Sequence, residues 1–173
     1  MFVAEELIAV LPAIGTEAPD FDLVSTEDVV LMLRDEVPRS PVLLFFFSGS
    51  ADGRAELAEL ERHSPRLAAK SIKLLGISER SLVELKALQQ ELRLSFPLLH
   101  DDRGFSRSYG VAAEAGRVLV LVDRNQRIAW IGSQLENLGA ELEALLSSRK
   151  RDSSPRANYP RSVINRLVDR WVN

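Results

Sequence analysis

One short stretch of the chain has the arrangement that many α/β proteins use for catalysis or for phosphate binding. The sequence FFFSGSADGRAEL, residues 45–57, runs from an apolar segment through a loop of small residues into a segment with helical spacing. Such junctions often carry a nucleophile or a set of backbone amides that holds a phosphate. Here the helix side of the loop carries Asp52, Gly53 and Arg54, and none of them is an obvious nucleophile. The stretch therefore predicts either a site of another kind or a site that has lost its chemistry.

The absence of cysteine limits the chemistry that remains. None of the 173 residues is a cysteine, which excludes disulfides, thiolate metal sites and every thiol mechanism. We expect no metal ion and no other cofactor. The chain is 46% hydrophobic and its net charge is only −3, so it can bury a core and has no overall reason to bind nucleic acid.

A serine hydrolase is one alternative that the sequence leaves open. It would pair Ser50 with His63 or His100 as the base. Ser50 falls one position early for a nucleophile elbow, and we expect His63 to be exposed beside a helix break. Capping of the following helix by Ser50 or Asp52 explains the same residues more simply.

A metal site is a second alternative, at His100, Asp101 and Asp102. Three consecutive residues rarely converge on one ion, and the sequence shows no second cluster of ligands. We therefore expect a turn before Gly104 rather than a metal centre. Trp130 lies in an apolar run, and we expect it in the core.

Apolar patterning predicts alternating strands and helices in the first 148 residues. A continuous apolar run, typical of a strand covered on both faces, lies at 41–47, and further strands are predicted at 71–78, 116–123 and 127–132. Helical spacing covers 53–70, 80–94 and 135–148. Pro65 is expected to kink or split the first of these helices. The order predicts an α/β fold with a helix-flanked sheet that ends in an antiparallel pair.

Three segments carry motifs that follow one another in a fixed order. They are IGTEAPDFDL at 14–23, SFPLLHDDRGFSRSYGV at 95–111 and RVLVLVD at 117–123. Together they resemble the peroxiredoxin or redoxin family, of the alkyl hydroperoxide reductase and thiol-specific antioxidant type, over roughly residues 10–147. The resemblance implies a thioredoxin-like fold with a central mixed sheet flanked by helices. A C-terminal helical extension follows the family's core.

The resemblance also locates the family's active site at the junction described first. Laid without gaps from Val42, the proline, threonine and peroxidatic cysteine positions fall on Phe47, Ala51 and Arg54. One shift in the loop would put Ala55 at the cysteine position. The two cysteine positions of the thioredoxin dithiol motif would fall on Ala51 and Arg54. We therefore predict a degenerate site and a catalytically inactive member of the family.

Arg117 is the active-site residue of the family that this sequence keeps. In active relatives such an arginine helps to lower the thiol pKa and to orient the peroxide. Arg54 and Arg117 could together bind a small anion, although Asp52 would oppose it. The simpler interpretation is that Arg54 is solvated or paired with a carboxylate.

The C-terminal part differs from the rest of the chain in charge. From Ser147 onward there are 7 Lys/Arg and 2 Asp/Glu, a net charge of +5, against −8 for the remainder. We predict a domain at 1–148, a basic linker at 149–160 and an amphipathic helix at 161–173. The residues of this helix that we expect to bind a partner are Ile164, Leu167, Val168 and Trp171, with Val163 on the same face.

The tail helix must bury its apolar face on its own domain, on a partner protein or on a second copy of the chain. We favour these over peripheral contact with a membrane, because the apolar face is only about three turns long. The N-terminal segment lacks the basic start of a signal peptide, so we expect a cytoplasmic protein. The favoured function is an accessory subunit or scaffold that acts by protein–protein interaction. The alternative is small-anion binding, or a redox-related enzyme that needs no cysteine.

Overall fold

The fold is taken from a computed structural model, which describes residues 12–47, 53–110 and 117–132, together with 138, 140, 141, 143 and 144. The chain divides into two compact units, Met1–Leu135 and Glu136–Asn173. All strands and helices named below belong to the first unit. In the second unit the described residues are helical, at positions where the sequence predicts the helix 135–148. The predicted domain boundary at residue 148 stays a prediction.

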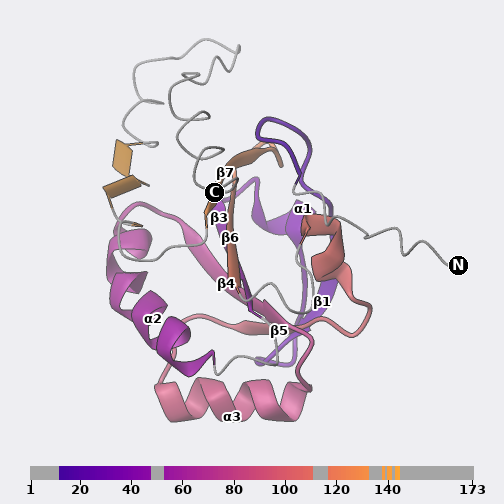
Figure 1. Ribbon diagram of the computed structural model, residues 1–173, viewed down its shortest axis with the longest axis vertical. Coiled ribbons are helices and arrows are strands. Elements are labelled where there is room, and N and C mark those ends of the chain that lie inside the picture. Colours follow the sequence, from indigo (N-terminus) through magenta and orange to yellow (C-terminus); the bar gives the residue numbers. More distant parts are fainter. Residues whose placement is uncertain are drawn as a thin grey trace, which may run out of the picture. The chain divides into compact units, whose positions relative to one another are not determined.

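Among the described residues, seven strands form one mixed sheet in the order β2-β1-β5-β4-β3-β6-β7 (Figure 1). The bounds are β1 Asp22–Ser25, β2 Val30–Met32, β3 Val42–Phe47, β4 Lys73–Ser78, β5 Leu98–His100, β6 Arg117–Val122 and β7 Ile128–Gly132. β3, β4 and β5 run parallel, and every other neighbouring pair is antiparallel. The mixed sheet and its antiparallel β6–β7 pair confirm the predicted α/β class.

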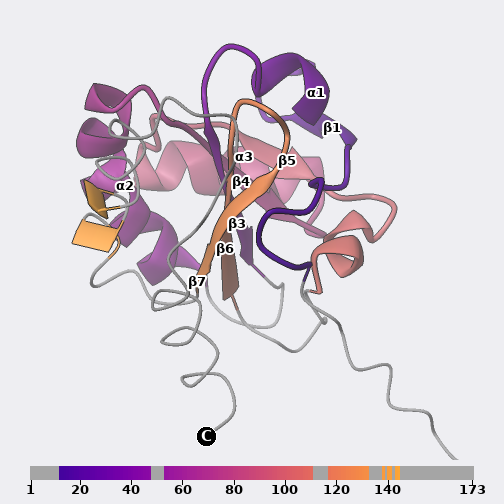
Figure 2. The same cartoon turned by 90° about the horizontal axis from the view of Figure 1, so that it is seen from above.

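Helices cover both faces of this sheet. α2, Arg54–Ala69, and α3, Leu82–Leu92, lie on one side of the strands, and the short α1, Leu33–Glu36, lies on the other (Figures 1 and 2). The 3₁₀ helix η1, Phe105–Tyr109, packs on the same side as α1, because both contribute to one core cluster. Side chains of β3 alternate between the two faces, and all six are buried.

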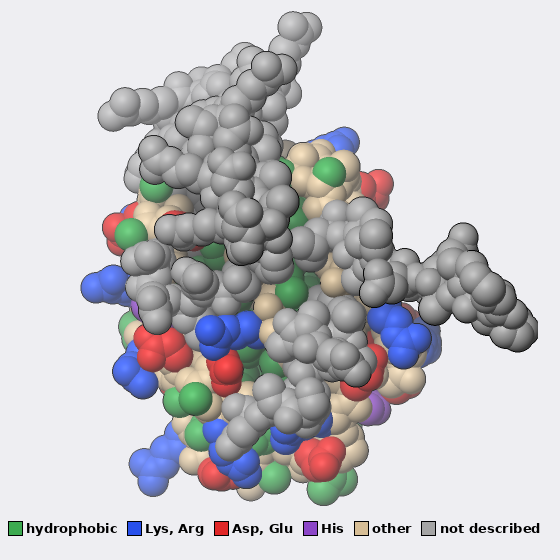
Figure 3. All heavy atoms as spheres, viewed as in Figure 1, with side chains coloured by type: hydrophobic (Ala, Val, Ile, Leu, Met, Phe, Trp, Pro, Cys, Tyr) green, Lys and Arg blue, Asp and Glu red, His purple; other side chains and the backbone are tan. Residues whose placement is uncertain are grey.

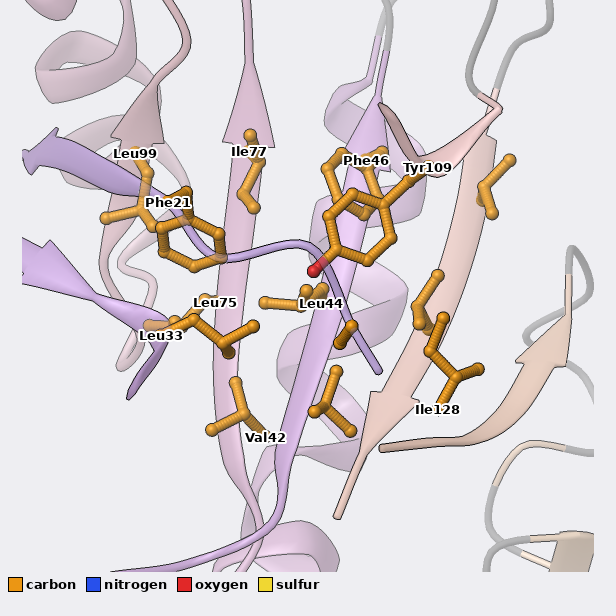
Figure 4. Packing of buried hydrophobic residues seen from close by; sticks show 14 of the residues in the cluster. Phe21, Leu33, Val42, Leu44, Phe46, Leu75, Ile77, Leu99, Tyr109 and Ile128 are labelled. Atoms are coloured by element: carbon orange, nitrogen blue, oxygen red, sulfur yellow. The ribbon is translucent and has the colours of Figure 1, made fainter. Parts of the chain in front are cut away.

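Two of the segments that carried the family resemblance meet in this core. Tyr109 is fully buried, and its ring centroid lies 4.9 Å from that of Phe46 on β3 (Figure 4). The Tyr109 hydroxyl donates a hydrogen bond to the Pro19 carbonyl at 2.6 Å. The next residue, Asp20, accepts the backbone N–H of Arg34 at the start of α1, at 3.1 Å. The N-terminal motif and the Tyr-Gly motif are therefore parts of one structural connection.

Of the two effects predicted for Pro65, the split of its helix is wrong, and the kink stays a prediction. α2 runs without interruption from Arg54 to Ala69 with Pro65 inside it. A proline removes one helical hydrogen bond and costs about 3 kcal/mol. Leu60 and Leu67, on either side of Pro65, are both buried, and each large apolar side chain contributes about 1.5–3 kcal/mol when fully buried. Packing on both sides of the proline thus keeps the helix in one piece.

A capping box formed by Ser81 and Glu84 marks the start of α3. Ser81 accepts the backbone N–H of Glu84, and the Glu84 carboxylate accepts the backbone N–H of Ser81 at 3.0 Å. The Glu84 carboxylate also accepts the Ser81 hydroxyl, and the hydrogen bonds from the Ser81 backbone N–H and hydroxyl lower the pKa of Glu84. At the other end Arg93 adopts a left-handed conformation with φ of 51° and stops the helix. None of the described helices is long and apolar enough to cross a membrane.

Candidate functional site at the start of helix α2

The site predicted from the sequence lies where β3 ends and α2 begins. Phe47 is the last residue of β3 and pairs with Arg117, the first residue of β6. Arg54 is the first residue of α2. The structure therefore brings Phe47, Arg54 and Arg117 to the same end of the sheet. Ala51 lies within residues 48–52, which are outside the described residues.

Phe47 fills the space between β3, β4 and α2. Its side chain is only 5% exposed, and its ring stacks on Phe45 at a centroid distance of 5.5 Å. A Cβ atom at Gly53 would lie 3.0 Å from the Phe47 ring, and one at Gly76 would lie 3.5 Å from it. The position to which the resemblance assigns the family's proline thus holds a buried aromatic ring, packed directly against the backbone before α2.

The predicted cap of α2 at Ser50 or Asp52 is wrong. The N-cap residue is Gly53, which has no side chain with which to bond the first helical amides. Glycine is acceptable at an N-cap, and here the neighbouring Phe47 ring leaves little room for a larger residue. Ser50 and Asp52 themselves lie outside the described residues, so the serine hydrolase alternative stays untested.

Arg54 binds a carboxylate at the far end of α3. Its Nε donates to Glu91 Oε1 at 3.1 Å and its Nη2 to Glu91 Oε2 at 3.0 Å, a two-pronged ion pair. The Arg54 and Glu91 side chains are 44% and 52% exposed, so the pair contributes at most about 1 kcal/mol of stability. Glu91 also offsets the unfavourable position of a cation at a helix N-terminus.

Arg117 binds a carboxylate in the first turn of α2. Its Nη1 donates to Glu56 Oε1 at 3.1 Å, with side-chain exposures of 40% and 22%. A glutamate in the first turn suits the positive end of the helix dipole. Sequence reasoning missed Glu56 and Glu91, because the spacing of residues along the chain does not reveal which acid a distant arginine will meet.

Both arginines of the candidate site have a carboxylate partner among the described residues. Each of the two arginines proposed to bind an anion holds a glutamate, and an incoming anion would have to share or displace it. On the face of the molecule shown in Figure 3, side chains of both signs lie next to one another among the described residues. The anion-binding role of Arg54 and Arg117 stays a prediction.

His63 and His100 lie on different elements, α2 and β5. His63 lies within α2 with its Nε2 3.4 Å from Glu59 Oε1, and its side chain is 17% exposed. The expectation that His63 is exposed is therefore wrong, because α2 continues past Pro65 and no helix break opens beside it. His100 is the last residue of β5, as expected, and its Nδ1 lies 2.7 Å from the Arg80 carbonyl.

Asp101 organises the turn after β5. It is 2% exposed, and its carboxylate accepts the backbone N–H groups of Phe105 and Ser106 at 2.7 and 2.8 Å. The Ser106 hydroxyl donates to the same carboxylate at 2.8 Å. The Asp102 carboxylate instead has its Oδ1 atom 3.9 Å from the Nε atom of Arg103. The described residues contain no group of three His, Cys, Asp or Glu side chains that could hold a metal ion.

The predicted partner-binding residues of the tail, Ile164, Leu167, Val168 and Trp171, lie outside the described residues, as do the linker 149–160 and the helix 161–173. Among the residues that the structure describes, the candidate site is reduced to an aromatic plug and two arginine–glutamate pairs. This arrangement contains groups that bind and orient, and it contains no described nucleophile at the start of α2.

Comparison with known proteins agrees with this fold. The family model described as the AhpC/TSA family matches residues 14–131. The comparison with curated proteins finds no match.

Among solved structures, the yeast mitochondrial 1-Cys peroxiredoxin superposes with a TM-score of 0.70 and 17% identity, covering 87% of this chain and 84% of its own. The mitochondrial 2-Cys peroxiredoxin of Plasmodium falciparum has a TM-score of 0.69 and 19% identity, with 85% and 100% covered. Peroxidoxin BcpB of Mycobacterium tuberculosis has a TM-score of 0.66 and 20% identity, with 82% and 98% covered. These likenesses show the thioredoxin-like peroxiredoxin fold. Because the family model matches well over half of its residues, this cysteine-free chain belongs to the AhpC/TSA family.

Proposed function

We propose that this chain is a non-enzymatic member of the AhpC/TSA family that acts by binding another protein, as an accessory subunit or scaffold of a larger assembly. The observation that carries the proposal is the complete absence of cysteine. Two similar structures are a 1-Cys and a 2-Cys peroxiredoxin, whereas this chain keeps the fold without a thiol. The cytoplasmic location expected from the sequence is part of the same proposal.

The surroundings of the cysteine position support this view. Phe47 occupies the space beside the helix start, and the Arg54 guanidinium is held on Glu91. Arg117, the arginine that the resemblance assigns to the thiol, is held on Glu56. A thiolate at the start of α2 would thus meet a buried aromatic ring and two glutamates. Carboxylates nearby disfavour the thiolate on which peroxide reduction depends.

We expect no peroxidase activity from the protein, and little from Arg54→Cys. The assay is the consumption of hydrogen peroxide by metal-free protein with a thioredoxin reducing system. The matched control is Val83→Cys, which places a thiol on an exposed position of α3 and reports background reactivity. The rate of Arg54→Cys should lie within about tenfold of this control, because Phe47 and Ala51 occupy the positions that the resemblance assigns to the family's proline and threonine. Fast, catalytic turnover by Arg54→Cys would show that the pocket is still competent.

The proposed partner-binding element is the tail helix. Burial of its large apolar side chains would contribute roughly 1.5–3 kcal/mol each, if complete. We expect the double substitution Leu167→Ala with Trp171→Ala to abolish co-purification of the partner from native extract, and to leave the melting temperature of the isolated protein within about 2 °C. The matched control is Arg166→Ala with Arg170→Ala, which removes charge and keeps the apolar face. Loss of stability with unchanged association would instead make the tail an internal brace.

A second candidate function is supported by one observation. Arg54 begins α2, and Arg117 is bonded to the first turn of the same helix, so both guanidinium groups lie at one helix N-terminus. This arrangement favours cysteine-independent binding of a small anion, or a redox-related reaction at the retained pocket. Calorimetric titration with inorganic phosphate discriminates between this second candidate and the protein-binding role proposed first. Binding that is lost in both Arg54→Ala and Arg117→Ala would support the second candidate, and its absence would support the first.

A further inference from the structure

The outer edge of the sheet at β2 exposes large apolar side chains together. Val24, Val29 and Val30 are 39%, 51% and 50% exposed. Val24 on β1 and Val30 on β2 are register partners, so their side chains lie beside each other on one face. The other large apolar side chain that is exposed among the described residues, Val83, lies on α3. The exposed valines thus gather on the β1–β2 hairpin.

The backbone of β2 also has groups that point away from the sheet. The amide of Ser25 donates to the carbonyl of Val29 at 2.9 Å, so Val29 faces β1. Facing alternates along an antiparallel strand, and Val30 and Met32 therefore turn their N–H and C=O groups outward. β2 is the last strand on this side, and no described strand pairs with these groups.

The opposite edge of the sheet, at β7, is covered by another segment of the chain. At β7 the amide of Gly15 donates to the Ile128 carbonyl at 2.7 Å, and the Ile128 amide donates to the Thr16 carbonyl at 2.9 Å. All residues of β7 are buried. Edge strands are usually covered or made unsuitable for pairing. Among the described residues, β2 has no covering segment bonded to its outer side and its side chains are less buried than those of β7, so it is the more available edge.

We infer that β2 of one copy pairs antiparallel with β2 of a second copy, so that two sheets join into one. In a register centred on Leu31, Val30 of each copy lies opposite Met32 of the other. The outward N–H and C=O groups of these two residues then form four hydrogen bonds across the two-fold axis. The same register sets Val30 against Met32 in two apolar cross-strand contacts.

Other symmetric registers make fewer hydrogen bonds. A register centred on Val30 would need the amide of Asp28, and one centred on Met32 would need the amide of Arg34. The Asp28 amide already donates to the Ser25 carbonyl, and its φ of 59° takes this residue out of extended backbone. The Arg34 amide already donates to an aspartate of its own chain, and Arg34 belongs to the helix α1. Neither residue continues the strand, so each of these registers keeps only the two hydrogen bonds of its central pair. The register centred on Leu31 is therefore the one that the structure leaves free.

Charges near the strand ends are compatible with this register. Asp28 of one copy comes opposite Arg34 of the other, with side chains 69% and 56% exposed, although within each copy Asp28 already pairs with Lys86 and Arg34 with Asp20. Glu27 and Asp35 would face each other one position further out, beyond the strand ends. The net electrostatic gain is therefore small, and the backbone hydrogen bonds with the apolar contacts provide the attraction. Such a small contact predicts a weak dimer.

This inference concerns the β2 edge and does not depend on the proposed function of the tail. The test is sedimentation analysis of the full chain from about 10 µM to 1 mM, a range that brackets weak association. We expect a monomer–dimer equilibrium. Val30→Lys should raise the dissociation constant at least about tenfold, since it replaces an apolar contact with a charge on the edge. Adding Met32→Glu to this variant should return the dissociation constant to within about threefold of the wild-type value, because each lysine then faces a glutamate of the other copy.

The matched control is Val83→Lys, an equivalent change on α3 that should leave the dissociation constant unaltered. Amide hydrogen exchange gives a second measure, since the amides of Val30 and Met32 should become protected as the concentration rises. A chain that is monomeric throughout, or a dimer that Val30→Lys does not weaken, overturns the inference. A dimer lost only in Leu167→Ala with Trp171→Ala assigns association to the tail and also overturns it. Failure of the rescue by Met32→Glu overturns the proposed register.

Discussion

Replacing Tyr109 with alanine should lower the free energy of unfolding by about 3–5 kcal/mol. The side chain is fully buried, with ring centroids 4.9 Å from Phe46 and 5.4 Å from Phe105, so its loss leaves a large cavity in the core. Urea unfolding at neutral pH measures the change. Val83→Ala, on an exposed position, should change the free energy by less than about 0.5 kcal/mol.

Tyr109→Phe separates the hydrogen bond from the packing. It keeps the ring and removes the donor to the Pro19 carbonyl, which should cost about 1–3 kcal/mol. Equal losses for Tyr109→Phe and Tyr109→Ala would contradict the cavity argument. Burial also raises the pKa of Tyr109 well above its ordinary value. The unfolded chain loses this proton first, so wild-type stability should fall by about 1.4 kcal/mol per pH unit above about pH 10 relative to Tyr109→Phe.

Replacing Asp101 with alanine should cost about 2–4 kcal/mol. Its buried carboxylate accepts the backbone N–H groups of Phe105 and Ser106, and the Ser106 hydroxyl. Removal leaves these donors without a partner at the start of η1, which carries Tyr109 into the core. The measurement is again the urea midpoint at a constant slope.

Two further variants test whether the loss of stability is specific to Asp101 and to the hydrogen bonds that it accepts. Asp102→Ala, next to Asp101 and 59% exposed, should have an effect below about 0.5 kcal/mol. Ser106→Ala removes one of the three hydrogen bonds and should cost about 0.5–1.5 kcal/mol. If Asp101→Ala were as mild as Asp102→Ala, the carboxylate would not be organising this turn.

The central strands could be predicted from the sequence because their signal is local. β3, β4 and β6 are buried on both faces, and such strands appear in the sequence as mostly apolar segments. The short turn between β6 and β7 indicated their antiparallel pairing, and Asp123 accepts the backbone N–H groups of Asn125 and Arg127 there at 2.9 Å. The helical spacing at 80–94 likewise predicted α3 to within two residues at each end.

Short elements could not be predicted, because neighbouring strands create them. β1, β2, β5, α1 and η1 each span three to five residues, too few to show a period. β5 is a strand because it lies between β4 and β1, and α1 starts where Asp20, fourteen residues earlier in the chain, accepts its amide. Only the assembled sheet provides these partners.

For the site, the sequence by itself determined that no thiol exists, and its resemblance to the family predicts that Phe47, Arg54 and Arg117 stand at active-site positions. The tertiary structure decided what surrounds them. It brought Glu91 to Arg54 across 37 residues and Glu56 to Arg117 across 61, and it packed Phe47 against the backbone before α2. The identity of a residue follows from its position in the chain. The partner of an ion pair depends on how helices and strands pack, because Coulomb attraction acts between groups that folding brings within a few ångströms.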